Sequence, residues 1–152
     1  MRIAVTSLLI FGCASTQHIR GTEIPDTEEN RAVLKAVERY RQAMERRDAV
    51  ALVSLAHPWY TENSGTAGGQ DDYGYEGLKK IIATRLAALK AVRYGMEYRS
   101  VSRSGNRAYV EVFIDASFQI VADTGDRWER KQDYNRFELL WDGKNWRFLS
   151  GM

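Results

Sequence analysis

The spacing of apolar residues changes once along this chain, near residue 93, and that change limits the possible folds more than any other feature. Before it, Val37, Tyr40 and Met44 recur at the spacing of one helix face. After it, residues 107–121 alternate in the pattern of a strand with one buried face. Helices followed by strands predict an α+β fold in which the helices pack on one face of an antiparallel sheet.

Three segments are expected to be helical. Asp26 and Glu29 have the spacing of a capping box at the start of the first helix, and Pro58 stops the second. The stretch 61–74 is rich in turn formers, and so long a loop is usually functional or mobile. The predicted helices cover residues 26–47, 49–55 and 75–93.

Four strands are expected to form an antiparallel meander after the helices. Ser104-Gly105-Asn106 supplies one turn, and residues 142–145 form a strong hairpin signal. The predicted strands cover residues 94–103, 107–121, 128–141 and 146–150.

Several segments together resemble the nuclear transport factor 2-like superfamily, which includes ketosteroid isomerase-like and polyketide cyclase-like proteins. They are the closing hairpin from Arg136 to Phe148, Tyr40 with Met44 and Asp48 on the first helix, the second helix from Leu52 to His57, and the third helix led by Gly77. The resemblance spans residues 27–152. It implies a strongly curved sheet that wraps the first helix into a cone with a pocket at its mouth. Members include enzymes and proteins that only bind or assemble, so the resemblance does not settle the function.

The first residues have the layout of an export signal. Met1 and Arg2 precede the apolar run Ile3–Phe11, which is too short to span a bilayer. Gly12 and Cys13 resemble the lipobox of bacterial lipoproteins, which implies cleavage after residue 12 and a diacylated Cys13. The alternative is an ordinary signal peptide and a buried cysteine. The predicted organisation is a signal peptide at 1–12, a lipidated tether at 13–25 and one domain at 26–152.

The expected location follows from the same resemblance. Ala14 stands where the aspartate of inner-membrane retention would be. We therefore expect a lipid anchor in the outer membrane, facing the periplasm.

Charge and residue types argue against several classes of function. The 22 Lys and Arg residues are interspersed with 20 Asp and Glu residues, so no basic nucleic-acid footprint is expected. Of the two histidines, His18 lies in the tether, and no metal-ligand spacing is present. Nucleophile and phosphate-loop motifs are also missing, so neither a metal nor a cofactor is expected.

The pocket implied by the resemblance has nine candidate residues. His57 is the only histidine of the domain, and Asp133 shares a strand face with the apolar core positions. These two are the candidate proton-transfer groups. In the alternatives, His57 only caps a helix dipole and Asp133 only pairs with an arginine such as Arg99. The possible pocket-lining residues are Tyr40, Met44, His57, Trp59, Tyr60, Tyr73, Asp133, Asn135 and Trp141.

The outer face of the sheet is a candidate interface, because aromatic residues mixed with arginine are enriched at interfaces. Its candidate residues are Tyr109, Phe113, Trp128, Tyr134 and Arg136. We expect a homodimer or an envelope partner there.

Together these features predict an exported protein whose domain binds a small apolar ligand or takes part in assembly, without catalysis. The alternative is a cofactor-free lyase or isomerase that acts on a small hydrophobic molecule through His57 and Asp133.

Overall fold

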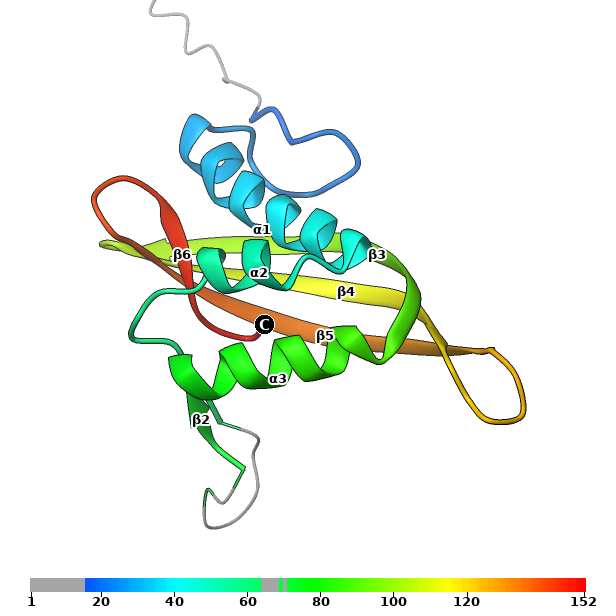
Figure 1. The fold of residues 1–152 in the computed structure, drawn as a ribbon. Helices are drawn as coiled ribbons and strands as arrows, with labels where there is room; N and C mark the ends of the chain where they lie inside the picture. The colour runs from blue at the N-terminus through cyan, green and yellow to red at the C-terminus, as the bar shows by residue number, and fades with distance from the viewer. Residues whose placement is uncertain (1–15, 64–68, 70) are drawn as a thin grey trace, which may run out of the picture.

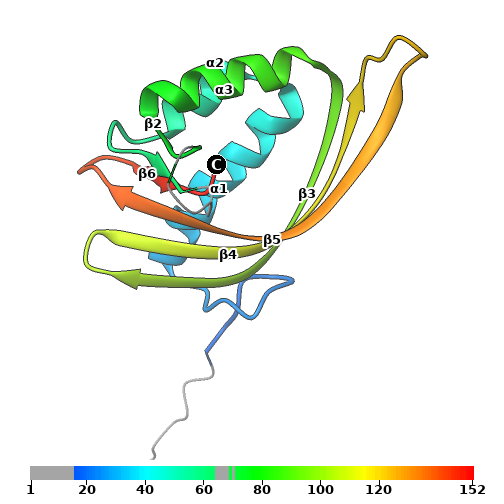
Figure 2. The same ribbon diagram turned by 90° about the horizontal axis from the view of Figure 1, so that it is seen from below.

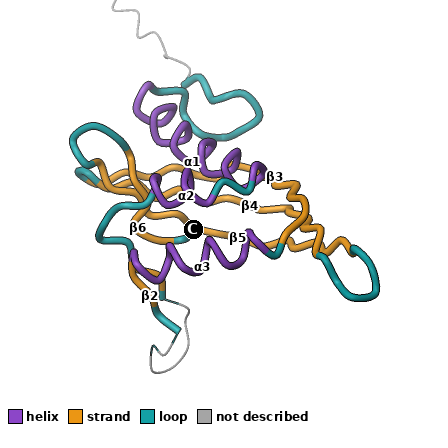
Figure 3. Tube along the Cα trace, viewed as in Figure 1, coloured by secondary structure: helices purple, strands orange, loops and turns teal. Residues whose placement is uncertain are grey.

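The computed structural model describes residues 16–63, 69 and 71–152. The predicted signal peptide and Cys13 lie outside these residues. Three helices pack against a four-stranded sheet, as Figures 1 and 3 show, which confirms the predicted α+β class. The helices are α1 (Glu28–Arg46), α2 (Ala49–Leu55) and α3 (Tyr75–Ala87). The sheet strands are β3 (Leu89–Ser104), β4 (Arg107–Ile120), β5 (Arg127–Trp141) and β6 (Trp146–Ser150), and the short strands β1 (Thr61–Glu62) and β2 (Tyr73–Gly74) pair separately.

Helix α1 begins one residue later than the predicted capping box requires. Its N-cap is Thr27, whose side chain accepts a hydrogen bond from the backbone N–H of Asn30 at 3.1 Å. Asp26 instead pairs with Arg31 in the first turns of the helix. The prediction of Asp26 as the cap was therefore wrong. The helix ends at Arg46, because its C-cap Arg47 has a left-handed backbone conformation.

The third helix ends at Ala87, so its predicted extension to Arg93 was wrong. The backbone becomes a strand at Leu89, and Val92 and Tyr94 pair with Phe118 and Ala116 of β4. The apolar spacing of this stretch fits a helix as well as a strand. Pairing with the long β4 strand decides between them, because tertiary context overrides weak local preference.

The sheet is a meander in the order β3-β4-β5-β6 with every neighbouring pair antiparallel. Figure 2 shows that it curves strongly around the helices on its concave side. The pairing register shifts at three places in the described sheet: between Leu89 and Ala91, between Tyr98 and Ser100, and between Glu138 and Leu139. At Gly95, a Cβ atom would lie 2.9 Å from the carbonyl oxygen of Asp115, so a glycine lets β3 and β4 approach closely.

The core lies between α1 and the concave face of the sheet. Val33 and Val37 of α1 are fully buried, as are Val110 on β4 and Phe137 on β5. The ring of Tyr40 packs 5.2 Å from the ring of Phe137, measured between centroids. These contacts fix α1 across the sheet and place Tyr40 at its centre.

Packed structure begins upstream of Asp26. Ile24 is 2% exposed, and its carbonyl accepts a hydrogen bond from the N–H of Ile19 at 2.8 Å. The N–H of Asp26 donates to the carbonyl of Gln17 at 2.7 Å. The segment from Gln17 onward is thus tied to the domain. None of the helices in the described part is long and apolar enough to cross a membrane.

Candidate functional site

A cavity of about 780 Å³ lies between α3 and the concave face of the sheet. Its lining becomes less buried along β4, since Ile114 and Ala116 are buried whereas Ile120 is half-buried. At the same end, Glu129 and Lys131 of β5 are exposed. The cavity therefore has an inner end near the core and a mouth near the β4–β5 turn.

Most of the inner lining is apolar. Helix α3 turns one apolar side toward the strands, and β4 contributes the inward half of its alternating pattern. Such a surface suits a hydrophobic molecule better than water. The apolar lining residues on these two elements are Leu78, Ile81, Ile82, Leu86, Ile114, Ala116, Phe118 and Ile120.

Two buried tyrosines supply polar groups inside this apolar lining. Tyr40 is 4% exposed and Tyr94 is 6% exposed, and their hydroxyl oxygens lie 3.4 Å apart. Burial raises the pKa of both phenols, so each keeps its proton at neutral pH. The two hydroxyl groups have two protons, and the single long hydrogen bond between them uses only one of these protons. Within the described residues, one proton is left without an acceptor.

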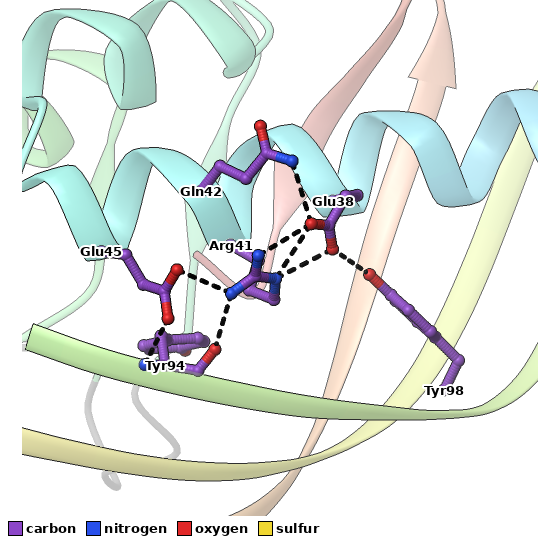
Figure 4. A network of polar contacts seen from close by, with 6 residues as sticks. All are labelled: Glu38, Arg41, Gln42, Glu45, Tyr94 and Tyr98. Carbon is purple, nitrogen blue, oxygen red and sulfur yellow. Dashed lines mark hydrogen bonds and ion pairs between the residues drawn. The ribbon is translucent and has the colours of Figure 1, made fainter. Parts of the chain in front are cut away.

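Tyr94 is held in place by the network in Figure 4. Arg41 of α1 donates to the backbone carbonyl of Tyr94 at 3.2 Å, and Glu45 accepts from its N–H at 3.2 Å. Arg41 also forms ion pairs with Glu38 and Glu45, both at 2.9 Å. The hydroxyl of Tyr98 donates to Glu38 at 2.9 Å. This network joins α1 to β3 and fixes the position of the Tyr94 ring.

A second polar group lies at the inner end. The hydroxyl of Tyr60 donates to Glu62 at 2.6 Å, and the N–H of Gly151 donates to the same carboxylate oxygen at 2.8 Å. Burial is the main reason that the pKa of Tyr60 is raised, and the hydrogen bond to Glu62 raises it further. Glu62, Gly151 and Met152 all line the cavity. Sequence reasoning missed these three residues, because only the fold brings the chain end to the β1 segment.

Five of the nine predicted pocket residues lie in the cavity lining. They come from α1, from β2 and from the middle of β5, three elements that the fold brings to one place. These residues are Tyr40, Met44, Tyr73, Asp133 and Asn135. Tyr94 was missed as a site residue, although its alternation with Val92 could have indicated an inward-facing position.

The other four predicted pocket residues lie outside the lining. His57 follows α2, and its Nδ1 accepts a hydrogen bond from the N–H of Trp59, which is exposed. Tyr60 is buried behind the lining and stacks on Tyr73, with centroids 6.4 Å apart. Trp141 packs against Trp146 at the β5–β6 hairpin. The structure therefore does not bring His57 and Asp133 into one site.

Asp133 lies on the exposed part of the lining. Its side chain is 60% exposed and forms a long ion pair of 3.7 Å with Lys131. Arg99 pairs with Glu97, so the Arg99 to Asp133 pairing considered from sequence does not form. Within the described ranges, no three His, Cys, Asp or Glu side chains come together in a way that could hold a metal ion.

The candidate interface residues lie on the convex face of the sheet. Phe113 and Tyr134 are cross-strand partners with ring centroids 5.1 Å apart, and Tyr134 is 71% exposed. The guanidinium of Arg136 lies 4.6 Å from the ring centroid of Tyr109. The ring of Trp128 is likewise covered by an arginine of β3. The five residues thus form an aromatic and cationic surface.

Comparison with known proteins identifies the fold. No family model and no curated protein matches the sequence. The chain is similar to a provisionally assigned dehydratase of the nuclear transport factor 2-like family from Streptomyces avermitilis, with a TM-score of 0.68 and 18% identity over 84% of this chain and 95% of that one. It is also similar to a ketosteroid isomerase-like protein from Erwinia carotovora atroseptica, with a TM-score of 0.65 and 17% identity over 82% of this chain and 94% of that one. Three helices on a curved antiparallel sheet, shared with these structures, give this chain the nuclear transport factor 2-like fold.

Proposed function

We propose that the domain binds a small, largely apolar molecule that carries an oxygen acceptor, and that it does so without catalysis. The cavity volume of about 780 Å³ falls within the roughly 300–1,000 Å³ range of small-molecule sites. The observation that carries the proposal is the pair of buried hydroxyls of Tyr40 and Tyr94. A carbonyl, ether or hydroxyl oxygen of a ligand would accept the proton that this pair leaves unpaired.

The positions of the acid and base candidates favour binding over catalysis. General acid–base catalysis needs a titratable group within hydrogen-bond reach of the reacting atoms. His57 lies outside the cavity lining, and Asp133 is exposed and paired with Lys131. Neither residue is held in the enclosed, desolvated position that such chemistry uses.

The test compares a neutral ketone with an alkane of the same length. Nonan-2-one and nonane are titrated against the protein loaded with the fluorescent apolar probe N-phenyl-1-naphthylamine. Both should displace the probe, and the ketone should bind more tightly. In the Y40F/Y94F double variant, ketone affinity should fall about tenfold, which is the loss of one hydrogen bond of about 1.4 kcal/mol, while alkane affinity stays the same.

The matched control is Tyr109→Phe, which removes a hydroxyl on the convex face of the sheet, outside both the cavity lining and the Arg41 network. It should leave the affinity for both compounds unchanged. Displacement by neither compound would refute binding in this cavity. Equal loss of ketone affinity in Tyr109→Phe would refute the role of the tyrosine pair.

The alternative is a cofactor-free lyase or isomerase. It is favoured by the position of Asp133 and Tyr73 in the lining, and by similar structures named as a dehydratase and a ketosteroid isomerase-like protein. On this alternative Asp133 transfers the proton, so Asp133→Asn would lower turnover, whereas His57→Gln would not, because His57 lies outside the lining. A cavity ligand that is recovered chemically unchanged after prolonged incubation speaks for binding alone.

The location is part of the same proposal. We propose that Cys13 carries lipid, and that the protein is exported and anchored in the outer membrane with its domain in the periplasm. Its support is the lipobox-like sequence around Gly12 and Cys13. Native mass spectrometry of protein purified from its own envelope should show the added mass of acyl chains, and Cys13→Ala should remove it. An unmodified cysteine in the envelope fraction would refute the anchor.

We further propose that the convex face of the sheet binds a second copy of this chain, with an envelope protein as the alternative partner. A two-fold interface needs a self-complementary surface. This face offers one, since it carries both signs of charge: Arg136 is the cross-strand partner of Glu111, and Arg130 pairs with Asp115. Tyr134→Glu should convert a dimer to a monomer in sedimentation experiments. A wild-type protein that is monomeric at high concentration would contradict the dimer.

A further inference from the structure

The last two residues of the chain turn into the concave side of the molecule. Figures 1 and 2 show the end of the chain between the helices and the sheet. The turn depends on Gly151, whose φ is +92°. A Cβ atom there would lie 2.5 Å from the carbonyl oxygen of Arg136. Only glycine fits this close approach, and it directs Met152 toward the cavity.

Hydrogen bonds from three residues hold this turn. Glu62 accepts from the N–H of Gly151 at 2.8 Å, and the side-chain amide of Asn135 donates to the carbonyl of Gly151 at 2.8 Å. The N–H of Met152 donates to the hydroxyl of Tyr60 at 3.0 Å, and that hydroxyl in turn donates to Glu62 at 2.6 Å. We refer to Tyr60, Glu62 and Asn135 as the clamp. It fixes the backbone of Gly151 and Met152 from β5 and from the segment that contains β1.

The clamp lies at the inner end of the cavity. Asn135 is the cross-strand partner of Val112, which is buried, and the next inward residue of β5 is the fully buried Phe137. Beyond this point along β5, the inward side chains belong to the core. Met152 lines the cavity and packs against the core cluster. Its side chain therefore closes the space between the cavity and the core.

We propose that the clamp holds Met152 as the inner end wall of the cavity and thereby sets the length of the apolar ligand that the cavity accepts. This inference rests on the proposed binding function. Tyr60 acts here as a positioning residue, because it lies behind the lining and acts on the ligand through lining residues that it contacts, among them Met152. Methionine suits an end wall because its unbranched side chain adapts to the shape beside it.

The test measures how affinity depends on ligand length. A series of straight-chain alkan-1-ols from hexanol to tetradecanol is titrated against the protein loaded with N-phenyl-1-naphthylamine. In the wild type, affinity should rise about fourfold per methylene until the chain reaches Met152, and then stop rising. In Met152→Ala, the rise should continue for about two or three further methylenes, because the truncated side chain leaves that space open.

Tyr60→Phe tests the clamp without changing a lining residue. It removes the hydroxyl that accepts from Met152 and should also move the limit to longer alcohols. Tyr109→Phe removes a hydroxyl on the convex face of the sheet, away from the cavity, and should leave the limit where it is. Thermal denaturation of each variant confirms that it is folded.

The outcomes separate the two proposals. If alcohols bind but the length limit is the same in the wild type, Met152→Ala and Tyr60→Phe, the end-wall inference is overturned and the binding function stands. If Tyr109→Phe moves the limit as much as Tyr60→Phe does, the clamp has no specific role. If no alcohol displaces the probe, the binding function fails and the inference fails with it.

Discussion

Replacing Arg41 with methionine should lower the free energy of unfolding by about 2 kcal/mol. The side chain of Arg41 is 23% exposed and bonds to Glu38, Glu45 and the carbonyl of Tyr94 (Figure 4). Exposed ion pairs contribute about 0–1 kcal/mol, whereas breaking a buried pair costs about 3–5 kcal/mol. The network is half-buried, so its loss should fall between these limits.

The same network makes stability depend on pH. Hydrogen bonds from Arg41, chiefly, and from Gln42 and Tyr98 lower the pKa of Glu38 below its ordinary value of 4.5. A carboxyl group with a lowered pKa in the folded state stabilises the protein above its unfolded pKa. This contribution is therefore present above about pH 4.5 and is lost as the pH falls below that value. The Arg41→Met variant should lose less stability than the wild type over this acid range.

Urea unfolding followed by tryptophan fluorescence measures both effects. Arg39 is an exposed arginine on the same helix, so Arg39→Met is the matched control and should change the free energy of unfolding by less than about 0.5 kcal/mol. A double-mutant cycle with Glu38→Gln isolates the coupling between the two partners. A loss below about 0.5 kcal/mol in Arg41→Met would show that the network does not hold α1 to β3.

Three further predictions concern stability. The wild type should lose stability as the pH falls from 3.8 toward 2, because backbone hydrogen bonds in the hairpin lower the pKa of Asp142 to about 2. Asp142→Ala should remove this pH-dependent contribution, and an unchanged acid unfolding curve would contradict the prediction. Gly151→Ala should lower the melting temperature more than Gly105→Ala does. Both glycines have a positive φ, but only at position 151 would the added Cβ atom clash, with the carbonyl oxygen of Arg136. Equal decreases in melting temperature would exclude this clash. Phe137→Ala should lower the free energy of unfolding in urea by about 3–5 kcal/mol, because the side chain is fully buried. A decrease below about 1 kcal/mol would show that neighbouring side chains fill the space left by the ring.

The order of elements could be predicted because it depends on local spacing. The alternation along β4 and the turn residues before β6 specify strands and hairpins with short-range signals. The boundary between α3 and β3 could not be predicted in this way. Leu89 and Val92 fit either pattern, and only their pairing with Ile120 and Phe118 makes the segment a strand.

The residues of the candidate site also differ in whether local periodicity could predict their positions. Tyr40 and Asp133 could be assigned to inward faces from the periodicity of their own elements. His57 could not be placed, because its position depends on how the chain leaves α2 and on the bond from its N–H to the carbonyl of Phe148. The role of Tyr60 depends on Met152, which is 92 residues away in the sequence.

Sequence alone determined that this chain forms helices and then an antiparallel sheet, because hydrophobic periodicity and turn chemistry are properties of neighbouring residues. Only the tertiary structure decided that α3 stands apart from the concave face and leaves a cavity there. It also decided that Tyr40 meets Tyr94 and that Gly151 meets Glu62. Such contacts join elements distant in the chain, and the curvature of the sheet sets their distances.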